Sequence, residues 1–298
     1  MNKKKTVKLT PQYLPGFVFC ILFVLGYVKS DAQDIPNRYD DLEKAKASPS
    51  DVRWLELKDK GYKEFPKDIF QFTNLEFLDL SGNQIKTVPG EIDQLTRLKY
   101  LDLSGNKIKR LPGSMADLDS LNTLHLAYLP GVDLVQVFPI ISQISGLRVL
   151  DLKYNNIETI PGSIRYFGQL ERLDLSGNPI RVLPEELAYL DRLKIFYLND
   201  DREFNLEQSL DVLAGIDQLQ ELHLENDDIQ VIPENITRMK SLEYLYINEN
   251  RLNQLPAGIR TMPSLKYIDV YDNPIPNVFL DEYRRYLAPS IKINIGNK

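Results

Sequence analysis

Residues 75–85 read LEFLDLSGNQI, and residues 98–108 and 170–180 repeat this stretch as LKYLDLSGNKI and LERLDLSGNPI. Each copy places leucine at positions one, four and six, asparagine at position nine and isoleucine at position eleven. Leucines that alternate with polar residues are typical of a short strand with one buried face. Ten copies of this pattern in register predict a chain built from one small unit stacked on itself.

The repeat units have two lengths. Their first residues lie 23 positions apart seven times and 26 positions apart twice, at Val52, Leu75, Leu98, Leu121, Leu147, Leu170, Leu193, Leu219, Leu242 and Leu265. Seven short units carry a proline at position fifteen, namely Pro66, Pro89, Pro112, Pro161, Pro184, Pro233 and Pro256. Proline there is expected to break the backbone that follows the strand before a return segment begins. The long units, which begin at Leu121 and Leu193, lack this proline.

The pattern resembles the leucine-rich repeat family over about residues 52–275, in the 23-residue form with an LPxxI segment that is similar to Ras-group and disease-resistance repeats. The resemblance implies an α/β solenoid. A parallel sheet would line the concave face of a curved arc, and short helical or irregular segments would form its convex face.

Asparagine at position nine can satisfy the backbone of the turn with both its donor and its acceptor. Most units keep it, at Asn83, Asn106, Asn155, Asn178, Asn250 and Asn273. The pattern fails at Leu129, Asp201 and Asp227, so the motif leaves the turn geometry there open.

The chain is expected to divide into a signal peptide at residues 1–32, an N-terminal helical cap at 33–51, ten repeats at 52–278 and a C-terminal cap at 279–298. A helix is predicted over residues 37–47. A second helix over 280–287 and a strand over 290–295 are predicted to close the other end. Caps are needed because a single repeat cannot bury enough apolar surface to fold alone.

The N-terminus predicts export. Four lysines precede an apolar run at residues 14–28, and small residues then stand before Gln33, where a signal peptidase would cut. The alternative is an uncleaved membrane anchor at residues 14–28, the one case in which a membrane partner is expected. Cleavage would make the chain a bacterial-type exported protein that is periplasmic, bound at the cell surface or secreted. It would also remove Cys20, which is the only cysteine.

The whole chain has a formal net charge of −6, and loss of the leader would leave −10. Such an acidic chain disfavours a nucleic-acid partner. It is compatible with plain solubility or with preference for a basic partner.

Outward-facing positions three, five and seven carry two groups of rings. The early aromatic column is Trp54, Phe77 and Tyr100. The late aromatic patch is Tyr197, His223, Tyr244, Tyr246, Tyr267 and Tyr271. Tyrosine offers a large rigid contact area with a polar tip, so both groups are candidate ligand-binding residues. Alternatively, the rings only pack on one another across the sheet.

Catalysis finds little support in the sequence. His125 and His223 are the only histidines, and four strand spacings would separate them by ~19 Å, too far to share a metal or a proton. We therefore predict a chain that is not an enzyme and has no cofactor, metal or catalytic residue.

The sequence predicts an exported binding module that recognises a protein or peptide through its concave face. Two alternatives remain open. One is a glycan-binding or adhesion protein, since sugar rings also stack on aromatic side chains. The other is an intracellular scaffold or small-GTPase regulator, which the repeat subtype suggests and the leader opposes.

Overall fold

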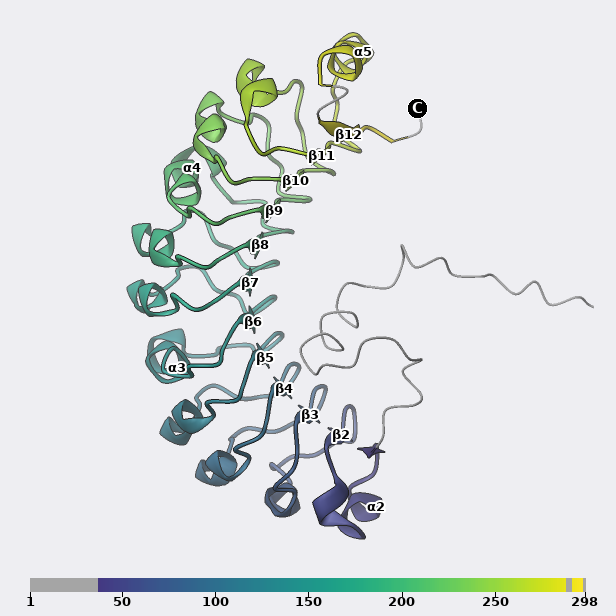
Figure 1. Ribbon diagram of the computed structural model, residues 1–298, viewed down its shortest axis with the longest axis vertical. Helices are drawn as coiled ribbons and strands as arrows, with labels where there is room; N and C mark the ends of the chain where they lie inside the picture. Colours follow the sequence, from purple (N-terminus) through teal and green to yellow (C-terminus); the bar gives the residue numbers. More distant parts are fainter. Residues whose placement is uncertain (1–36, 288–290, 297–298) are drawn as a thin grey trace, which may run out of the picture.

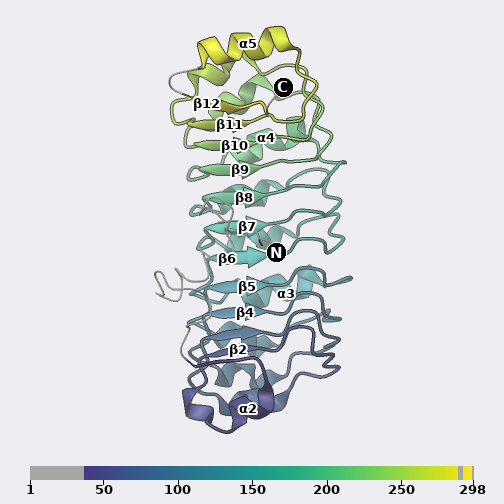
Figure 2. The same cartoon turned by 90° about the vertical axis from the view of Figure 1, so that its right-hand side faces the viewer.

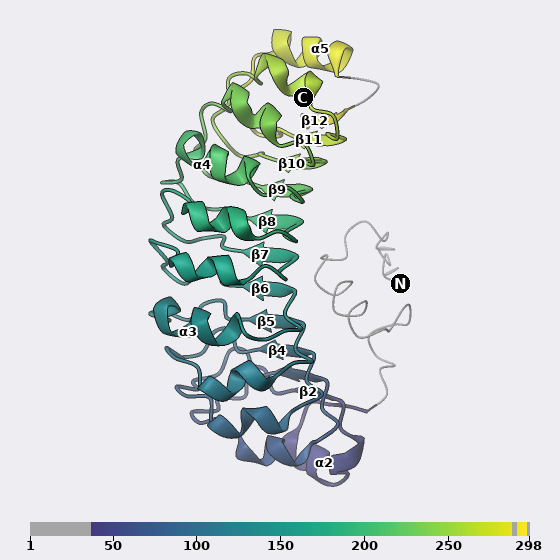
Figure 3. The same cartoon turned by 60° about the vertical axis from the view of Figure 1, so that its left-hand side comes forward.

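The computed structural model describes residues 37–287 and 291–296, and these form a curved stack of repeats (Figure 1). One parallel sheet of 12 strands runs through the stack, and its strands follow the order of the sequence. The sheet lines the concave side of the arc, while the return helices lie on the convex side (Figures 1 and 3). The predicted α/β solenoid is therefore confirmed.

Ten of the strands cover positions three to five of a repeat. Equal positions pair across neighbouring strands, as Trp54 does with Phe77 and Tyr246 with His223. Each motif position therefore forms a straight column across the sheet. The strands are β1 Arg38–Tyr39, β2 Trp54–Glu56, β3 Phe77–Asp79, β4 Tyr100–Asp102, β5 Thr123–His125, β6 Val149–Asp151, β7 Arg172–Asp174, β8 Ile195–Tyr197, β9 Glu221–His223, β10 Tyr244–Tyr246, β11 Tyr267–Asp269 and β12 Lys292–Asn294.

The core lies between the sheet and the convex segments. Leu75, Leu78 and Leu80 are 0% exposed, and the same positions of the other repeats stack on them along the arc. A fully buried leucine contributes roughly 1.5–3 kcal/mol by leaving water. Because each repeat buries these side chains against its neighbours, the core is continuous from one end to the other.

Each proline at position fifteen stands directly before a short 3-10 helix. The Pro89 backbone, for example, has φ −71°, and its carbonyl accepts a hydrogen bond from Ile92 N–H at 3.3 Å. Proline suits this place because the N–H groups that begin a helix have no partner within it. The seven helices are η3 Lys67–Gln71, η4 Gly90–Gln94, η5 Gly113–Asp117, η6 Gly162–Tyr166, η7 Glu185–Tyr189, η8 Glu234–Arg238 and η9 Ala257–Thr261.

The two long repeats replace this 3-10 helix with an α-helix. These helices are α3 Leu134–Ile141 and α4 Leu206–Ala214. Asp133 caps α3 and Asn205 caps α4, each by accepting a hydrogen bond from a backbone N–H of the first turn. Both helices stay in line with the 3-10 helices on the convex side (Figure 3). The three extra residues therefore lengthen the return segment and leave the sheet unchanged.

The two ends of the stack are covered by α2 Leu42–Lys46 with η2 Pro49–Asp51, and by α5 Asn277–Tyr286 (Figure 2). The helix predicted over residues 37–47 is too long. Asn37 has φ 67°, Arg38–Tyr39 pair with β2, and the Asp41 side chain caps the helix that then begins. At the other end the helix starts at Asn277, before its predicted limit at residue 280.

The predicted signal peptide and the alternative anchor lie outside the described residues. Within residues 37–287 and 291–296, no helix is long and apolar enough to cross a membrane.

Candidate functional site

The rings of the early aromatic column stack face to face. Ring centroids of Trp54 and Phe77 lie 3.6 Å apart with planes at 9°, and those of Phe77 and Tyr100 lie 4.2 Å apart at 6°. His125 continues the column at 5.2 Å from Tyr100. All three rings of the column are at most 7% exposed. Their faces are thus occupied by one another, as expected if they only pack across the sheet.

The aspartates at position five serve the turn that follows each strand. Asp79 accepts a hydrogen bond from Ser81 N–H at 2.8 Å, and Asp174 accepts one from Ser176 N–H at 3.1 Å. The same bond recurs at Asp102, Asp151 and Asp269. Burial and a neighbouring carboxylate raise the pKa of Asp79 and of Asp174. These acids therefore have a structural role in the five repeats that carry them.

Four members of the late aromatic patch form a continuous row. The His223 ring lies 4.0 Å from that of Tyr197 and 4.3 Å from that of Tyr246, with planes at 19° and 7°. Tyr267 follows at 5.4 Å from Tyr246, tilted by 50°. Tyr197, Tyr246 and Tyr267 remain partly exposed. The structure therefore brings these predicted residues together on one surface of strands β8–β11.

The other two tyrosines of the patch flank this row. Tyr244 pairs with Tyr267 across β10 and β11. Tyr271 is 49% exposed, and its ring lies against the backbone of Gly296, where a Cβ atom would come within 2.3 Å of Cδ2. Tyr271 thus extends the patch toward the rim at the carboxyl ends of the strands.

His223 is held between two carboxylates as well as between two rings. Its Nε2 lies 2.7 Å from Glu221 Oε1, and its Nδ1 lies 3.3 Å from Glu225 Oε1. Burial alone would lower the pKa of His223, but hydrogen bonds to Glu221 and Glu225 outweigh it and raise the pKa above its usual value. An imidazolium at this place can donate one hydrogen bond to each carboxylate, since both ring nitrogens then carry a proton.

Arg172 belongs to the same row, although the sequence analysis missed it. Its guanidinium carbon lies 4.5 Å from the centroid of the Tyr197 ring, on the β7 side of the row. This is a cation–π contact. The repeat pattern could have indicated this contact, because Arg172 occupies the outward position three of the strand that pairs with β8.

The rim beside the sheet has a feature that the sequence analysis also missed. Position eight always has a left-handed backbone, and the motif often places glycine there, as at Gly82, Gly105 and Gly177. Tyr128 and Tyr154 adopt the same conformation with φ 53°, although it is unfavourable for large side chains. Their exposed rings stack at 4.8 Å. The Tyr154 ring lies over Gly177, and its hydroxyl donates to Asp200 Oδ2 at 2.6 Å.

Asparagine at position nine forms a ladder under this rim. Asn83 Nδ2 donates to the carbonyl oxygens of Leu57 and Leu80, each at 2.8 Å, and its Oδ1 accepts from Tyr62 N–H at 3.0 Å. Asn106, Asn178, Asn250 and Asn273 repeat the donations to two carbonyls. This ladder fixes the turns that follow the strands.

The turns at Leu129, Asp201 and Asp227, which the sequence left open, keep this geometry. Position eight stays left-handed before all three residues. Asp201 Oδ2 accepts from Ile180 N–H at 2.9 Å, and Asp227 Oδ1 accepts from Asp201 N–H at 2.7 Å. Leu129 has no polar side chain, yet its own N–H donates to Asn155 Oδ1 at 2.6 Å. The acceptor half of the ladder alone is enough to form the two aspartate turns.

Neither aspartate can donate the hydrogen bonds that the asparagine amides make to backbone carbonyls, unless its carboxyl group binds a proton. Asp201 is 2% exposed and Asp227 is 1% exposed. Asp227 Oδ2 is buried without a hydrogen-bond partner among the described residues. Burial raises the pKa of Asp201 to about 7 and that of Asp227 to about 9. A protonated carboxyl group can donate as the asparagine amide does.

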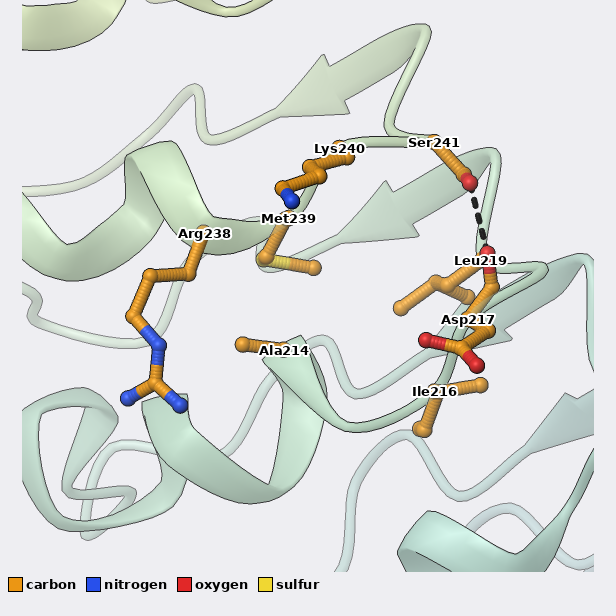
Figure 4. A pocket seen from close by; sticks show the side chains of 8 residues that line it. All are labelled: Ala214, Ile216, Asp217, Leu219, Arg238, Met239, Lys240 and Ser241. Carbon is orange, nitrogen blue, oxygen red and sulfur yellow. Dashed lines mark hydrogen bonds between the residues drawn. The ribbon is translucent and has the colours of Figure 1, made fainter.

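A hollow on the convex side lies away from these rings. It has a volume of about 560 Å³ and lies between the carboxyl ends of α4 and η8, where Ser241 Oγ donates to the carbonyl of Asp217 (Figure 4). None of the nine candidate residues lines it. Among the described residues, no group of three or more His, Cys, Asp or Glu side chains could hold a metal ion.

Comparison with solved structures shows the same fold in several proteins. An internalin, InlF from Listeria monocytogenes, has a TM-score of 0.64 at 18% identity, over 88% of this chain and 72% of its own. FLRT2, in a complex with Latrophilin 3 and Unc5D, has a TM-score of 0.62 at 22% identity, over 86% of this chain and 78% of its own. TLR13, in a complex with ssRNA13, has a TM-score of 0.71 at 22% identity over 86% of this chain. The match covers only 38% of the TLR13 chain.

Family comparison covers most of the repeats. No curated protein matches the sequence. The family described as leucine-rich repeat region matches residues 47–136, and the family described as leucine rich repeat matches residues 140–180 and 217–275. The chain belongs to the leucine-rich repeat family.

Proposed function

We propose that this chain is an exported, non-enzymatic binding module that recognises a protein or peptide through the concave surface of strands β8–β11. The observation that carries the proposal is the row of Tyr197, His223, Tyr246 and Tyr267, in which the three tyrosine rings remain partly exposed on one surface around the buried His223. Rigid aromatic side chains of this kind dominate the binding energy of many protein interfaces.

The fold supports a binding role without naming a partner. FLRT2 shares this fold, and its structure is that of an assembly with two other proteins. TLR13 also shares it and is described with an RNA, so the fold alone leaves a nucleic-acid partner open. The argument against RNA is the formal net charge of −6, because RNA binding relies on basic surfaces.

Export is supported by the leader pattern at residues 1–32. N-terminal sequencing of the protein from separated cell fractions tests it. A mature chain that begins at Gln33 outside the cytoplasm is expected. An intact chain in the cytoplasm would contradict export and favour an intracellular scaffold, while an intact chain in the membrane fraction would favour an anchor.

Binding can be tested before the natural partner is identified. The purified protein would be panned against a displayed library of random peptides twelve residues long. A Tyr246→Ala/Tyr267→Ala protein would be panned in parallel. Peptides that enrich on the first protein and not on the second are expected. Equal enrichment on both would contradict the assignment of the concave patch.

A matched control uses exposed tyrosines of the convex side. Tyr166 and Tyr189 lie on η6 and η7 and are 65% and 54% exposed. The Tyr166→Ala/Tyr189→Ala variant likewise removes two tyrosine side chains, but from the convex surface. It is expected to enrich the same peptides as the unchanged protein.

A glycan ligand is the second candidate, and the exposed stack of Tyr128 and Tyr154 favours it. Sugar rings pack on aromatic faces, and the bonded Asp200 carboxylate nearby offers acceptors for hydroxyl groups. Binding to a glycan array that is lost in a Tyr128→Ala/Tyr154→Ala protein would support this candidate. An array without signal would exclude it.

A further inference from the structure

The concave surface of strands β8–β11 carries acids without matching basic side chains. Positions three, five, seven and eight of these four repeats include six carboxylates, at Asp200, Glu221, Glu225, Glu249, Asp269 and Asp272. No lysine or arginine occupies any of these positions. His223 is the one group there that can become a cation. The nearest basic residues in the sheet are Arg172 on β7 and Lys292 on β12.

Within the chain, a cationic side chain already stacks on a tyrosine ring of this row. The Arg172 guanidinium lies over one face of Tyr197, at 4.5 Å from the centroid. The His223 ring covers the other side of Tyr197 and also stacks on Tyr246. Since Glu221 and Glu225 contact both nitrogens of His223, this ring is placed to carry a positive charge. Cations and tyrosine rings therefore alternate from Arg172 to Tyr246.

The alternation ends at Tyr246 and Tyr267. These two rings are tilted by 50° to each other, so neither covers the face of the other. Asp269 pairs with Tyr246 in register and accepts a hydrogen bond from the Tyr267 hydroxyl at 2.9 Å. Glu249 and Asp272 follow on the exposed rim. A planar cation could lie on a ring here while its donors reach these carboxylates, which is the geometry that a guanidinium prefers.

We propose that the partner of this surface is a basic segment of a protein or peptide, with arginine or lysine side chains that lie on Tyr246 and Tyr267 against the carboxylates of β9–β11 and their rim. The inference rests on the proposed function, because it names the chemistry of a partner at the same surface. In the complex, the cation of the partner would continue the alternation of cations and tyrosine rings that begins with Arg172 and His223.

The test uses the peptides that enrich on the full-length protein in the panning described above. Arginine and lysine are expected to be over-represented in them relative to the unselected library. The dissociation constant of a synthesised peptide should rise when salt is raised from about 50 mM to about 300 mM, since the screening length for exposed charges falls from roughly 14 Å to roughly 6 Å over this range.

Charge removal on the rim gives the decisive variant. A Glu249→Gln/Asp272→Asn protein should bind the basic peptide roughly three-fold to ten-fold more weakly, the effect of losing one or two exposed charge contacts. The matched control is Glu185→Gln/Glu207→Gln, which removes two exposed acids from η7 and α4 on the convex side. The control should bind as the unchanged protein does.

The possible results separate this inference from the proposed function. Enriched basic peptides that are weakened by salt and by the rim variant would support both. Enriched peptides that depend on Tyr246 and Tyr267 but lack basic residues, or that bind the rim variant equally well, would overturn the basic partner and keep the binding surface. No enrichment over the Tyr246→Ala/Tyr267→Ala protein would overturn both.

Discussion

The two ends of the concave surface carry different ring arrangements on the same motif. At the N-terminal end, Trp54 and Phe77 stack at 3.6 Å, and the column is at most 7% exposed. At the C-terminal end, Tyr246 and Tyr267 lie 5.4 Å apart at a tilt, and both are partly exposed. Register is identical at both ends. What differs is the choice of rings and their neighbours, so the same register gives a closed stack at one end and a more open, tilted pair of rings at the other.

The turns beneath these two ends differ in the same direction. The early repeats use Asn83 and Asn106, whose amides donate to two carbonyls and accept from the preceding repeat. The late repeats include Asp201 and Asp227, which keep only the acceptor unless protonated. The turns at Asp201 and Asp227, which follow β8 and β9, are therefore expected to respond to pH, whereas the asparagine turns are not.

The largest effect on stability is expected from the early column. Phe77→Ala should lower the free energy of unfolding by about 3–5 kcal/mol, because it removes a buried ring that contacts two others. Urea denaturation measures this change. Peptide binding by the folded variant should stay unchanged, and a loss of binding without a loss of stability would assign the early column to the ligand surface instead.

The largest effect on binding is expected from the late patch. Tyr246→Ala/Tyr267→Ala should reduce the binding free energy of the selected peptide by roughly 2 kcal/mol or more for each ring, as the loss of central aromatic residues does at other interfaces. Isothermal titration calorimetry measures the affinity. Both rings are partly exposed, so the unfolding midpoint should fall less than in Phe77→Ala. A fall of the same size would mean that these tyrosines serve the fold.

Exchange of one ladder residue should have opposite effects in the two halves. At pH 8, Asp227→Asn should raise the free energy of unfolding by about 1–3 kcal/mol, because the amide can donate without the proton that the Asp227 carboxylate must bind on folding at this pH. Asn106→Asp in an early turn should lower it by a similar amount. Denaturation of the two variants in parallel measures both. If Asp227→Asn is neutral or destabilising, Asp227 has another partner.

The pH dependence of stability follows from the same aspartates. In the unfolded chain both titrate near pH ~4, while in the folded chain their pKa values are about 7 for Asp201 and about 9 for Asp227. Between these limits the folded state binds more protons, so their contribution is complete below pH ~4 and is lost as pH rises toward about 9. The free energy of unfolding should fall over this window. Asp201→Asn/Asp227→Asn should flatten the decline, and an unchanged slope would contradict these pKa shifts.

The smallest effect is expected at the end of the late row. Arg172→Met keeps most of the length of the side chain and removes the cation from the Tyr197 ring. Stability should fall by about 0.5–1 kcal/mol, the value of an exposed cation–π contact. Thermal unfolding at low and high salt would reveal it. An equal loss in Arg172→Lys and Arg172→Met would show that the planar guanidinium, more than its charge, matters.

The sequence predicts the fold well because the buried positions recur. Leu78, Leu101 and Leu124 stand at equal motif positions, and the strands pair in that register. The same register places Tyr246 beside His223. What the sequence could not show depends on side-chain direction. The reach of Tyr154 over Gly177 to Asp200 spans 46 residues, and no local pattern encodes it.

The burial of the early column and of the two ladder aspartates was equally hidden. Trp54 and Tyr246 both occupy outward positions, and only the packing around them separates a closed stack from an exposed patch. The sequence shows that Asp227 departs from the motif. Only the structure shows that its Oδ2 is buried without a hydrogen-bond partner among the described residues. The N-terminal helix was overestimated because Arg38–Tyr39 instead extend the sheet.

Photo-crosslinking would locate the partner directly. A selected peptide that carries a benzophenone group would be irradiated with the full-length protein, and the linked residues would be identified by mass spectrometry. Crosslinks confined to strands β8–β11 and their rim are predicted. Crosslinks on strands β2–β5 or on the convex helices would contradict the assignment of the late aromatic patch as the recognition surface.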